Sequence, residues 1–233
     1  MRNDLIARTA ILASFALTLV GVHTSSVAAT NLALEVTHQS SSLGADGIKR
    51  DTLFTEHVIR QGDTVWIERV IPAGAHTASE HGKEKNLKGH KHADLNNAVR
   101  WIQKLPDGKL KLRLVALHDK VIVDVAPNEF ANVGFDGGWA AAYHLIDPAV
   151  LKKLKPTQTE GSSQWFVSAP SSSSNSVRIL WAQKNEIPMA VLTQNVSGTT
   201  KRSTTVRVMS QSPSTPWRNL SQFSVKEYSD FLD

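Results

Sequence analysis

Alternating hydrophobic and polar residues predict β-strands over most of the chain after Leu32. In the clearest segment, Leu110, Leu112 and Leu114 alternate with Lys111 and Arg113. Comparable patterns predict strands at 32–38, 53–59, 64–71, 99–103, 110–117, 121–125, 164–168, 176–182, 189–196 and 203–209. Turn sequences such as Gln61-Gly62-Asp63 and Pro106-Asp107-Gly108 separate successive strands, which indicates antiparallel hairpins.

Several of these strands carry apolar residues on both faces, as where Trp66 lies between Val65 and Ile67. A sheet with one face in water does not need two apolar faces, whereas a curved sheet shelters both of them. The pattern therefore predicts a mainly β protein of the α+β class. We expect a curved antiparallel sheet or half-barrel that covers a few short helices and an apolar cavity.

Helical signals are few. Asp147-Pro148 is typical of a helix N-terminus, and residues 139–146 form a candidate short helix after a glycine-containing turn. Ser224 and Glu227 have the spacing of a capping box, which predicts helical turns near the C-terminus. The apolar residues around this box predict that segment 215–233 is docked on the domain.

The first 29 residues have the order of a secretory signal peptide. Arg2 and Arg8 precede an apolar run at 9–22, and Val27-Ala28-Ala29 provides small residues for cleavage. The run is short for a membrane span. We therefore expect cleavage after Ala29, export to the periplasm, and no transmembrane segment after processing.

Residues 30–233 have the length of one β-rich domain, without a linker or an internal repeat. The chain contains no cysteine, which excludes disulfides and thiolate metal sites. Its formal net charge of +5 is a mild basic excess, and we expect no nucleic acid partner. The domain carries one long polar insertion rich in histidine and lysine, at 72–97.

The insertion contains His76, His81, His90 and His92, interleaved with lysines. Imidazole is a common ligand of copper, zinc and nickel, so these four residues are candidate metal ligands. The lysines oppose a bound cation, and a solvated loop explains the same composition. A pH-sensitive lid and a basic docking loop for an acidic partner are further interpretations.

Four tryptophans lie on predicted strands: Trp66, Trp101, Trp165 and Trp181. They are candidates for lining a ligand cavity, although large aromatic side chains also dominate ordinary cores. The chain contains none of the nucleophile-elbow, metalloprotease, phosphate-loop or dinucleotide-binding motifs. We therefore predict a protein that is not an enzyme and needs no cofactor, unless the histidine loop binds a metal.

The hairpin 178–192 resembles one in the periplasmic outer-membrane lipoprotein carrier superfamily, some members of which sense envelope stress. In that hairpin a strand ending in tryptophan enters a polar turn, and an apolar-Pro-apolar step begins the returning strand. Trp181 and Ile187-Pro188-Met189 occupy those places here. The hairpin 54–71 also resembles the opening strands of the superfamily. Ala182 and Glu186 depart from the acidic residue and the glycine that are usual at their positions, and the opening helix is missing.

The residues and the resemblance together predict a non-enzymatic periplasmic binding or carrier protein. Its cavity is expected to hold a lipid, an acyl chain or a lipoprotein, and an envelope protein is a further candidate partner. The alternative function is metal handling or metal sensing by the histidine-rich loop at 76–92.

Overall fold

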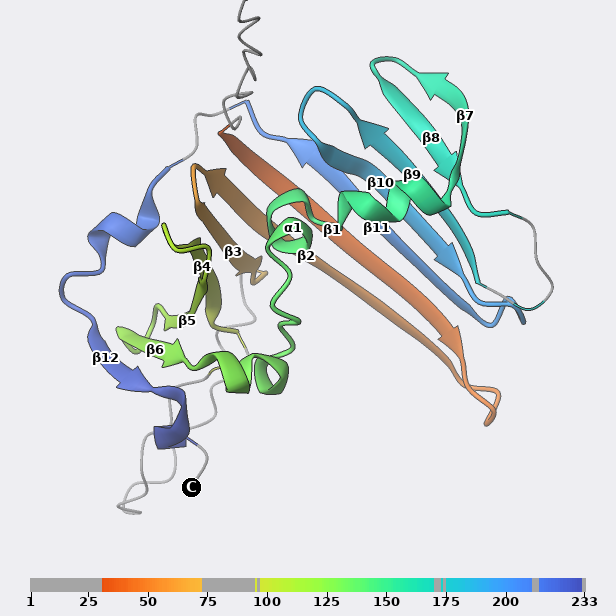
Figure 1. Cartoon of the computed structure of the whole chain (residues 1–233). Helices are drawn as coiled ribbons and strands as arrows, with labels where there is room; N and C mark the ends of the chain where they lie inside the picture. Colours follow the sequence, from red (N-terminus) through yellow and green to blue (C-terminus); the bar gives the residue numbers. More distant parts are fainter. Residues whose placement is uncertain are drawn as a thin grey trace, which may run out of the picture.

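The structure is a computed structural model that describes residues 31–72, 95, 97–169, 173, 175–210 and 214–231. Within this part of the chain, twelve strands form one sheet in the order β12-β6-β5-β4-β3-β2-β1-β11-β10-β9-β8-β7 (Figure 1). The strands are β1 (Leu32–Leu43), β2 (Lys49–Gln61), β3 (Thr64–Val70), β4 (Val99–Lys104), β5 (Leu110–Ala116), β6 (Val121–Val125), β7 (Lys155–Glu160), β8 (Ser163–Val167), β9 (Ser176–Ala182), β10 (Ile187–Gln194), β11 (Thr200–Val208) and β12 (Ser224–Glu227).

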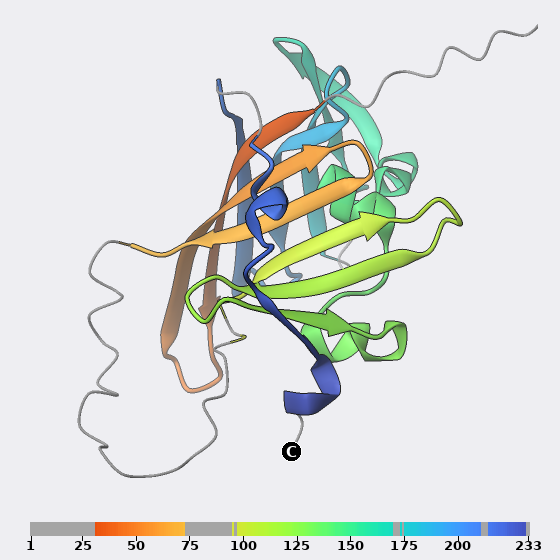
Figure 2. The same ribbon diagram turned by 90° about the vertical axis from the view of Figure 1, so that its left-hand side faces the viewer.

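The sheet is curved and open, as the turned view shows (Figure 2). Its strand pairs are antiparallel, except that β12 runs parallel to β6. The predicted class, mainly β with few helices in a curved sheet, is confirmed. Every strand predicted from alternation corresponds to a strand of the structure, with shifts of a few residues at the ends.

The helices are short. The α-helix α1 spans Trp139–His144, and the 3₁₀ turns are η3 (Pro127–Val133), η4 (Pro148–Lys153), η5 (Pro216–Asn219) and η6 (Tyr228–Phe231). The predicted start at Asp147 is confirmed, because its carboxylate accepts a hydrogen bond from the amide of Ala149 at 2.9 Å. Segment 127–153, with η3, α1 and η4, lies across one face of the sheet, and the C-terminal segment crosses the other face (Figures 1 and 2).

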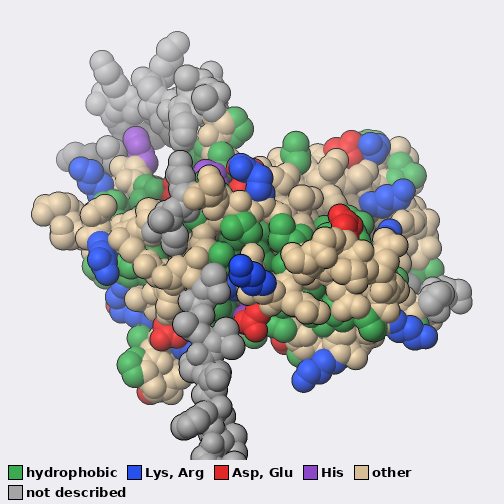
Figure 3. Space-filling view, turned by 90° about the horizontal axis from the view of Figure 1, so that it is seen from above, with side chains coloured by type: hydrophobic (Ala, Val, Ile, Leu, Met, Phe, Trp, Pro, Cys, Tyr) green, Lys and Arg blue, Asp and Glu red, His purple; other side chains and the backbone are tan. Residues whose placement is uncertain are grey.

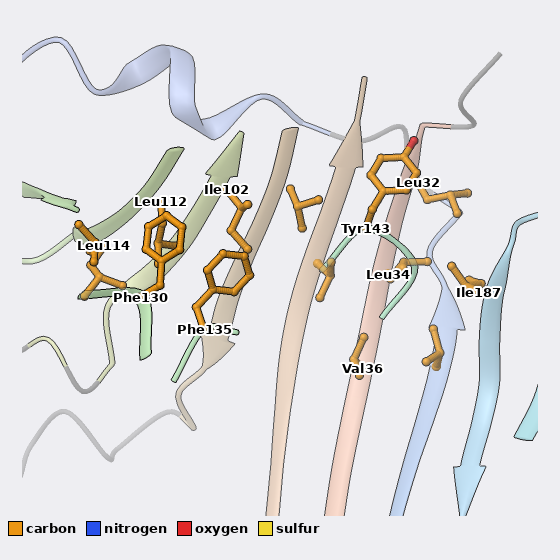
Figure 4. Packing of buried hydrophobic residues seen from close by; sticks show 14 of the residues in the cluster. Leu32, Leu34, Val36, Ile102, Leu112, Leu114, Phe130, Phe135, Tyr143 and Ile187 are labelled. Atoms are coloured by element: carbon orange, nitrogen blue, oxygen red, sulfur yellow. The ribbon is translucent and has the colours of Figure 1, made fainter. Parts of the chain in front are cut away.

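Two hydrophobic clusters hold these layers together. In the larger one, Phe130, Phe135 and Tyr143 of segment 127–153 pack on strand residues such as Leu34 and Leu112 (Figure 4). The rings of Phe130 and Phe135 meet edge to face, with centroids 5.2 Å apart. Burial of these rings stabilises the helical segment against the sheet, since large apolar side chains contribute most of the driving force for packing.

The smaller cluster lies on the opposite face of the sheet. There Leu220 is buried, and Trp217 and Phe223 pack against the buried strand residues Trp66 and Val115. The strand alternation accounts for the two clusters, because successive side chains point to opposite faces. The described part of the C-terminal segment, 214–231, is therefore docked on the sheet.

One local prediction is wrong in part, and one strand was not predicted. The capping-box spacing of Ser224 and Glu227 marks a strand, β12, because these residues pair with the free edge of β6, and the predicted helical turn, η6, begins only at Tyr228. Strand β7 was not predicted: its residues are exposed throughout and show no apolar alternation, and pairing with β8 determines its conformation.

The predicted signal peptide and cleavage site lie outside the described residues, as does most of the insertion at 72–97. They remain predictions. No helix in the described part of the chain is long and apolar enough to span a membrane.

Candidate functional site

A pocket of about 360 Å³ lies between segment 127–153 and the sheet; we call it the central groove. The chain builds it from alternate residues of the strands and from the turn and helix that face them. Its main apolar lining residues are Val36, Val58, Ile67, Ile102, Phe135, Ala141, Leu145, Pro188 and Val191. This volume is within the range of roughly 300–1,000 Å³ that is usual for small-molecule sites.

The helical wall of the groove has a defined local geometry. The carboxylate of Asp136 accepts a hydrogen bond from the amide of Gly138 at 2.8 Å, which sets the turn before α1. Leu145 ends α1 with φ of 67°, a left-handed conformation that is uncommon for a leucine. Both Asp136 and Leu145 line the groove, so the backbone that forms this wall is closely constrained.

Besides Asp136, three charged or ionisable residues line the groove: His38 on β1, Glu56 on β2 and Arg100 on β4. The Glu56 carboxylate lies 3.0 Å from His38 Nε2 and 3.1 Å from the Arg100 guanidinium. Its side chain is 14% exposed, against 29% for His38 and 36% for Arg100. We call this set the polar cluster.

Burial alone raises the pKa of Glu56, but hydrogen bonds and charge interactions with His38 and Arg100 offset it, so that the pKa lies below the ordinary value. The ionised carboxylate only accepts hydrogen bonds, and His38 Nε2 therefore donates to it. His38 Nδ1 lies 3.2 Å from the hydroxyl of Thr204 on β11. The paired Arg100 and Glu56 carry opposite charges.

Hydrogen bonds connect the side chains of Thr204, His38 and Glu56 in the order of a nucleophile, a base and an orienting acid. Thr204, however, lies within a strand that is paired on both sides, with His38 and with Val191. The backbone amides around it are engaged in the ladder and do not supply the free donors of an oxyanion hole. The arrangement instead provides hydrogen-bond donors and acceptors beside an apolar wall.

A second pocket, of about 680 Å³, lies at the β6 side of the same segment, where Leu110, Val125, Pro127 and Phe130 line it. Charged residues at its border include Lys109, Lys111 and Asp124. We call it the edge pocket. Lys111 and Asp124 form an ion pair at 3.2 Å, so that charges of both signs flank an apolar interior.

The structure brings two of the four predicted tryptophans together. Trp66 and Trp101 lie opposite each other on β3 and β4, with ring centroids 6.4 Å apart, under Trp217 of the C-terminal segment. Trp165 donates a hydrogen bond to Glu160 at 2.8 Å, and the Trp181 ring lies 6.4 Å from that of His144. None of the four lines the central groove or the edge pocket, and their contact with a ligand stays a prediction.

The predicted metal ligands His76, His81, His90 and His92 lie outside the described residues. Among the residues that are described, no group of three or more histidines and carboxylates has the geometry to hold a metal ion. The metal-binding alternative therefore stays a prediction of the sequence.

Sequence reasoning missed the polar cluster. His38 and Glu56 are 18 positions apart, and Arg100 is 44 positions from Glu56, so that no local motif joins them. The available signal is strand alternation: His38 follows Leu34 and Val36 on one face of β1. The pairing of that face with Glu56 depends on the hairpin register, which the sequence does not specify.

No family model and no curated protein matches the chain. The search of solved structures finds PNGF-II, with 13% identity over 86% of this chain and a TM-score of 0.36; this chain spans 33% of its length. A LolA superfamily protein from Nitrosomonas europaea matches with 10% identity over 83% of this chain and 90% of its own, with a TM-score of 0.35. MucB matches with 9% identity over 82% of this chain and 57% of its own, with a TM-score of 0.38. The chain is thus weakly similar in fold to proteins of the LolA superfamily, which its hairpin sequence resembles, and to MucB.

Proposed function

We propose that the protein is an exported, non-enzymatic binding or carrier protein whose central groove holds one acyl chain of a lipid or lipoprotein. The observation that supports this proposal is the composition of the groove. Apolar side chains of the sheet face apolar side chains of segment 127–153, and the polar cluster lies beside them. An amphipathic ligand has the same division into an apolar chain and a polar head.

The polar cluster offers hydrogen-bond donors and acceptors to the polar head of a ligand. Arg100 supplies donors, and Glu56 supplies acceptors whose charge balances that of Arg100. An ester, an amide or a glycerol group finds partners of both kinds there. The acyl chain gains roughly 0.8 kcal/mol for each methylene that leaves water, so the apolar wall provides most of the affinity.

Blocking the groove tests the proposal. Ala141 lines the groove, whereas its neighbour Ala140 lines neither pocket. We expect Ala141→Phe to weaken binding of a dansyl-labelled undecanoic acid at least tenfold, and Ala140→Phe to change it less than twofold. Fluorescence titration of the two variants and the wild type measures this, with circular dichroism to show that each is folded.

Equal binding by the two variants would mean that the fatty acid binds elsewhere. Absence of binding to all three proteins would remove the acyl ligand from the proposal. Native mass spectrometry of protein purified from periplasm, followed by lipid extraction, provides an independent check. We expect a bound lipid in the wild-type protein and none in the Ala141→Phe variant.

A further inference from the structure

Two turns lie side by side at one end of the sheet, on the lower right of Figure 1. One joins β1 to β2, and the other joins β10 to β11; the amide of Leu43 donates to the carbonyl of Thr199 at 2.8 Å and links them. Leu43, Ile48 and Val196 are 50%, 55% and 54% exposed there. We call residues 43–51 and 195–202 the hairpin tip.

A single exposed apolar residue needs no explanation, but three on adjacent turns form a local apolar surface. Turns in water are normally built from polar residues and glycine, so folding alone does not require these side chains. They contribute to neither hydrophobic cluster of the domain.

The charges around this apolar surface are mainly positive. The tip carries four cations, Lys49, Arg50, Lys201 and Arg202, against the carboxylates of Asp46 and Asp51. Lys49 pairs with Asp51 at 2.9 Å and Arg50 with Asp46 at 2.7 Å. Lys201 and Arg202 are exposed and form no ion pair with another described residue, which leaves the tip with an excess of two positive charges.

We propose that the hairpin tip docks onto the surface of an anionic lipid bilayer. Leu43, Ile48 and Val196 insert at the boundary between head groups and acyl chains, and Lys201 and Arg202 contact lipid phosphates. The face seen in Figure 3 has Lys and Arg side chains distributed over it rather than gathered in one place.

The position of the tip relative to the central groove fits this role, and this step rests on the proposed function. His38 of the polar cluster is the groove residue of β1 nearest the tip, since it follows Val36 along β1 toward Leu43. Leu43 lies five positions after His38 along the strand, which corresponds to about 16 Å. A docked tip therefore holds the groove within a short distance of the bilayer.

Vesicle binding tests the docking surface. The exported chain is sedimented with vesicles of phosphatidylglycerol and phosphatidylethanolamine, and with vesicles of phosphatidylcholine. We expect binding to the anionic vesicles only, weakened by salt. Combined Lys201→Gln and Arg202→Gln should weaken it roughly 25-fold at low salt, because each cation near an anionic surface contributes a factor of roughly five.

The apolar part is tested by combining Leu43→Gln, Ile48→Gln and Val196→Thr. Its matched control combines Leu117→Gln, Val150→Thr and Val225→Thr, which change exposed apolar residues away from the tip. We expect the affinity for anionic vesicles to fall at least tenfold in the first triple variant, which we call the tip variant, and to change less than twofold in the control. Equal losses in both, no loss in the tip variant, or no vesicle binding by the wild type would overturn the proposal.

A dimer of the wild type that the tip variant abolishes, seen by analytical ultracentrifugation, would also overturn it, since the tip would then contact a second copy. The dansyl-labelled fatty acid separates this proposal from the preceding one. The tip variant should bind it as the wild type does. Loss of fatty-acid binding by Ala141→Phe, with vesicle binding retained, shows that the two surfaces act separately.

Discussion

Glu56 carries the charge that makes the polar side of the central groove stable. Its carboxylate accepts hydrogen bonds from His38 at 3.0 Å and from Arg100 at 3.1 Å, and its side chain is largely buried. These contacts hold the pKa of Glu56 below its ordinary value despite burial, which by itself raises it. A depressed pKa in the folded state means that the ionised form is bound more favourably there than in the unfolded chain.

Glu56→Gln should lower the free energy of unfolding at pH 7 by about 1–2 kcal/mol, because two charge-assisted hydrogen bonds are lost. The contribution of Glu56 is present above the pKa of the unfolded chain, about 4.3, and is lost as pH falls through the lower pKa of the folded state. The difference in free energy of unfolding between variant and wild type should therefore become smaller below about pH 4. Urea unfolding at pH 7 and pH 3.5 measures it.

Glu35→Gln is the matched control for that comparison. Glu35 also lies on a central strand and pairs with Arg207 at 2.9 Å, but on the other face and more exposed, at 30%. Exposed pairs contribute about 0–1 kcal/mol. A loss of stability in Glu35→Gln as large as that in Glu56→Gln would contradict the role given to the polar cluster. A loss of stability in Glu56→Gln that does not depend on pH would contradict it as well.

At the scale of elements, Arg60 connects the sheet to α1. This buried residue on β2 donates hydrogen bonds to the carbonyls of Tyr143 and Asn185, at 3.3 and 2.7 Å. Its guanidinium also lies 4.4 Å from the centroid of the Tyr143 ring. The helical wall of the groove thus depends on a buried cation that satisfies backbone acceptors.

Arg60→Met keeps much of the side-chain volume and removes these hydrogen bonds. We expect amide hydrogen exchange in α1 to become at least tenfold faster, with less change in β5 and β6. Arg69→Met, at an exposed residue on the neighbouring strand, serves as the comparison. Unchanged exchange in α1 would show that Phe135 and Tyr143 hold the segment without Arg60.

The docked C-terminal segment is a second element that can be tested. Leu220 packs against Trp66 and its neighbours and is only 9% exposed. Leu220→Ala should lower the free energy of unfolding by about 2–3 kcal/mol and Tm by roughly 5–10 °C. Val225→Ala, at a residue 62% exposed, should change stability by less than about 0.5 kcal/mol. A Leu220→Ala protein that melts with the wild type would mean that the segment contributes little to stability.

Elements with an apolar alternation could be predicted from the sequence, and those without one could not. The strand at 110–117 is visible because Leu110, Leu112 and Leu114 must face a core. Strand β7 has only exposed residues, and β12 carries a capping-box pattern that is typical of a helix start. In both segments, pairing with a neighbouring strand determines the conformation. An apolar cavity was predicted, but the lining residues of the central groove could not be, since they meet only through strand register and the segment packed above.

At the scale of the whole molecule, the sheet has two differently used faces. Segment 127–153 covers one face and forms the central groove with it, whereas the C-terminal segment covers the other with a packed cluster around Trp66. We assign ligand binding to the first face and stability to the second. A ligand should therefore contact methyl groups of the groove and none of the packed cluster.

Isotope-filtered NOE spectroscopy of the methyl-labelled protein with unlabelled dodecanoic acid tests this claim most directly. The predicted result is a set of NOEs from the acyl chain to the methyl groups of Val58, Ile67 and Ile102, which line the groove. Val115 and Ile122, in the cluster on the opposite face, should give none. NOEs confined to the Val115 and Ile122 methyl groups, or no NOEs to the protein at all, would contradict the account.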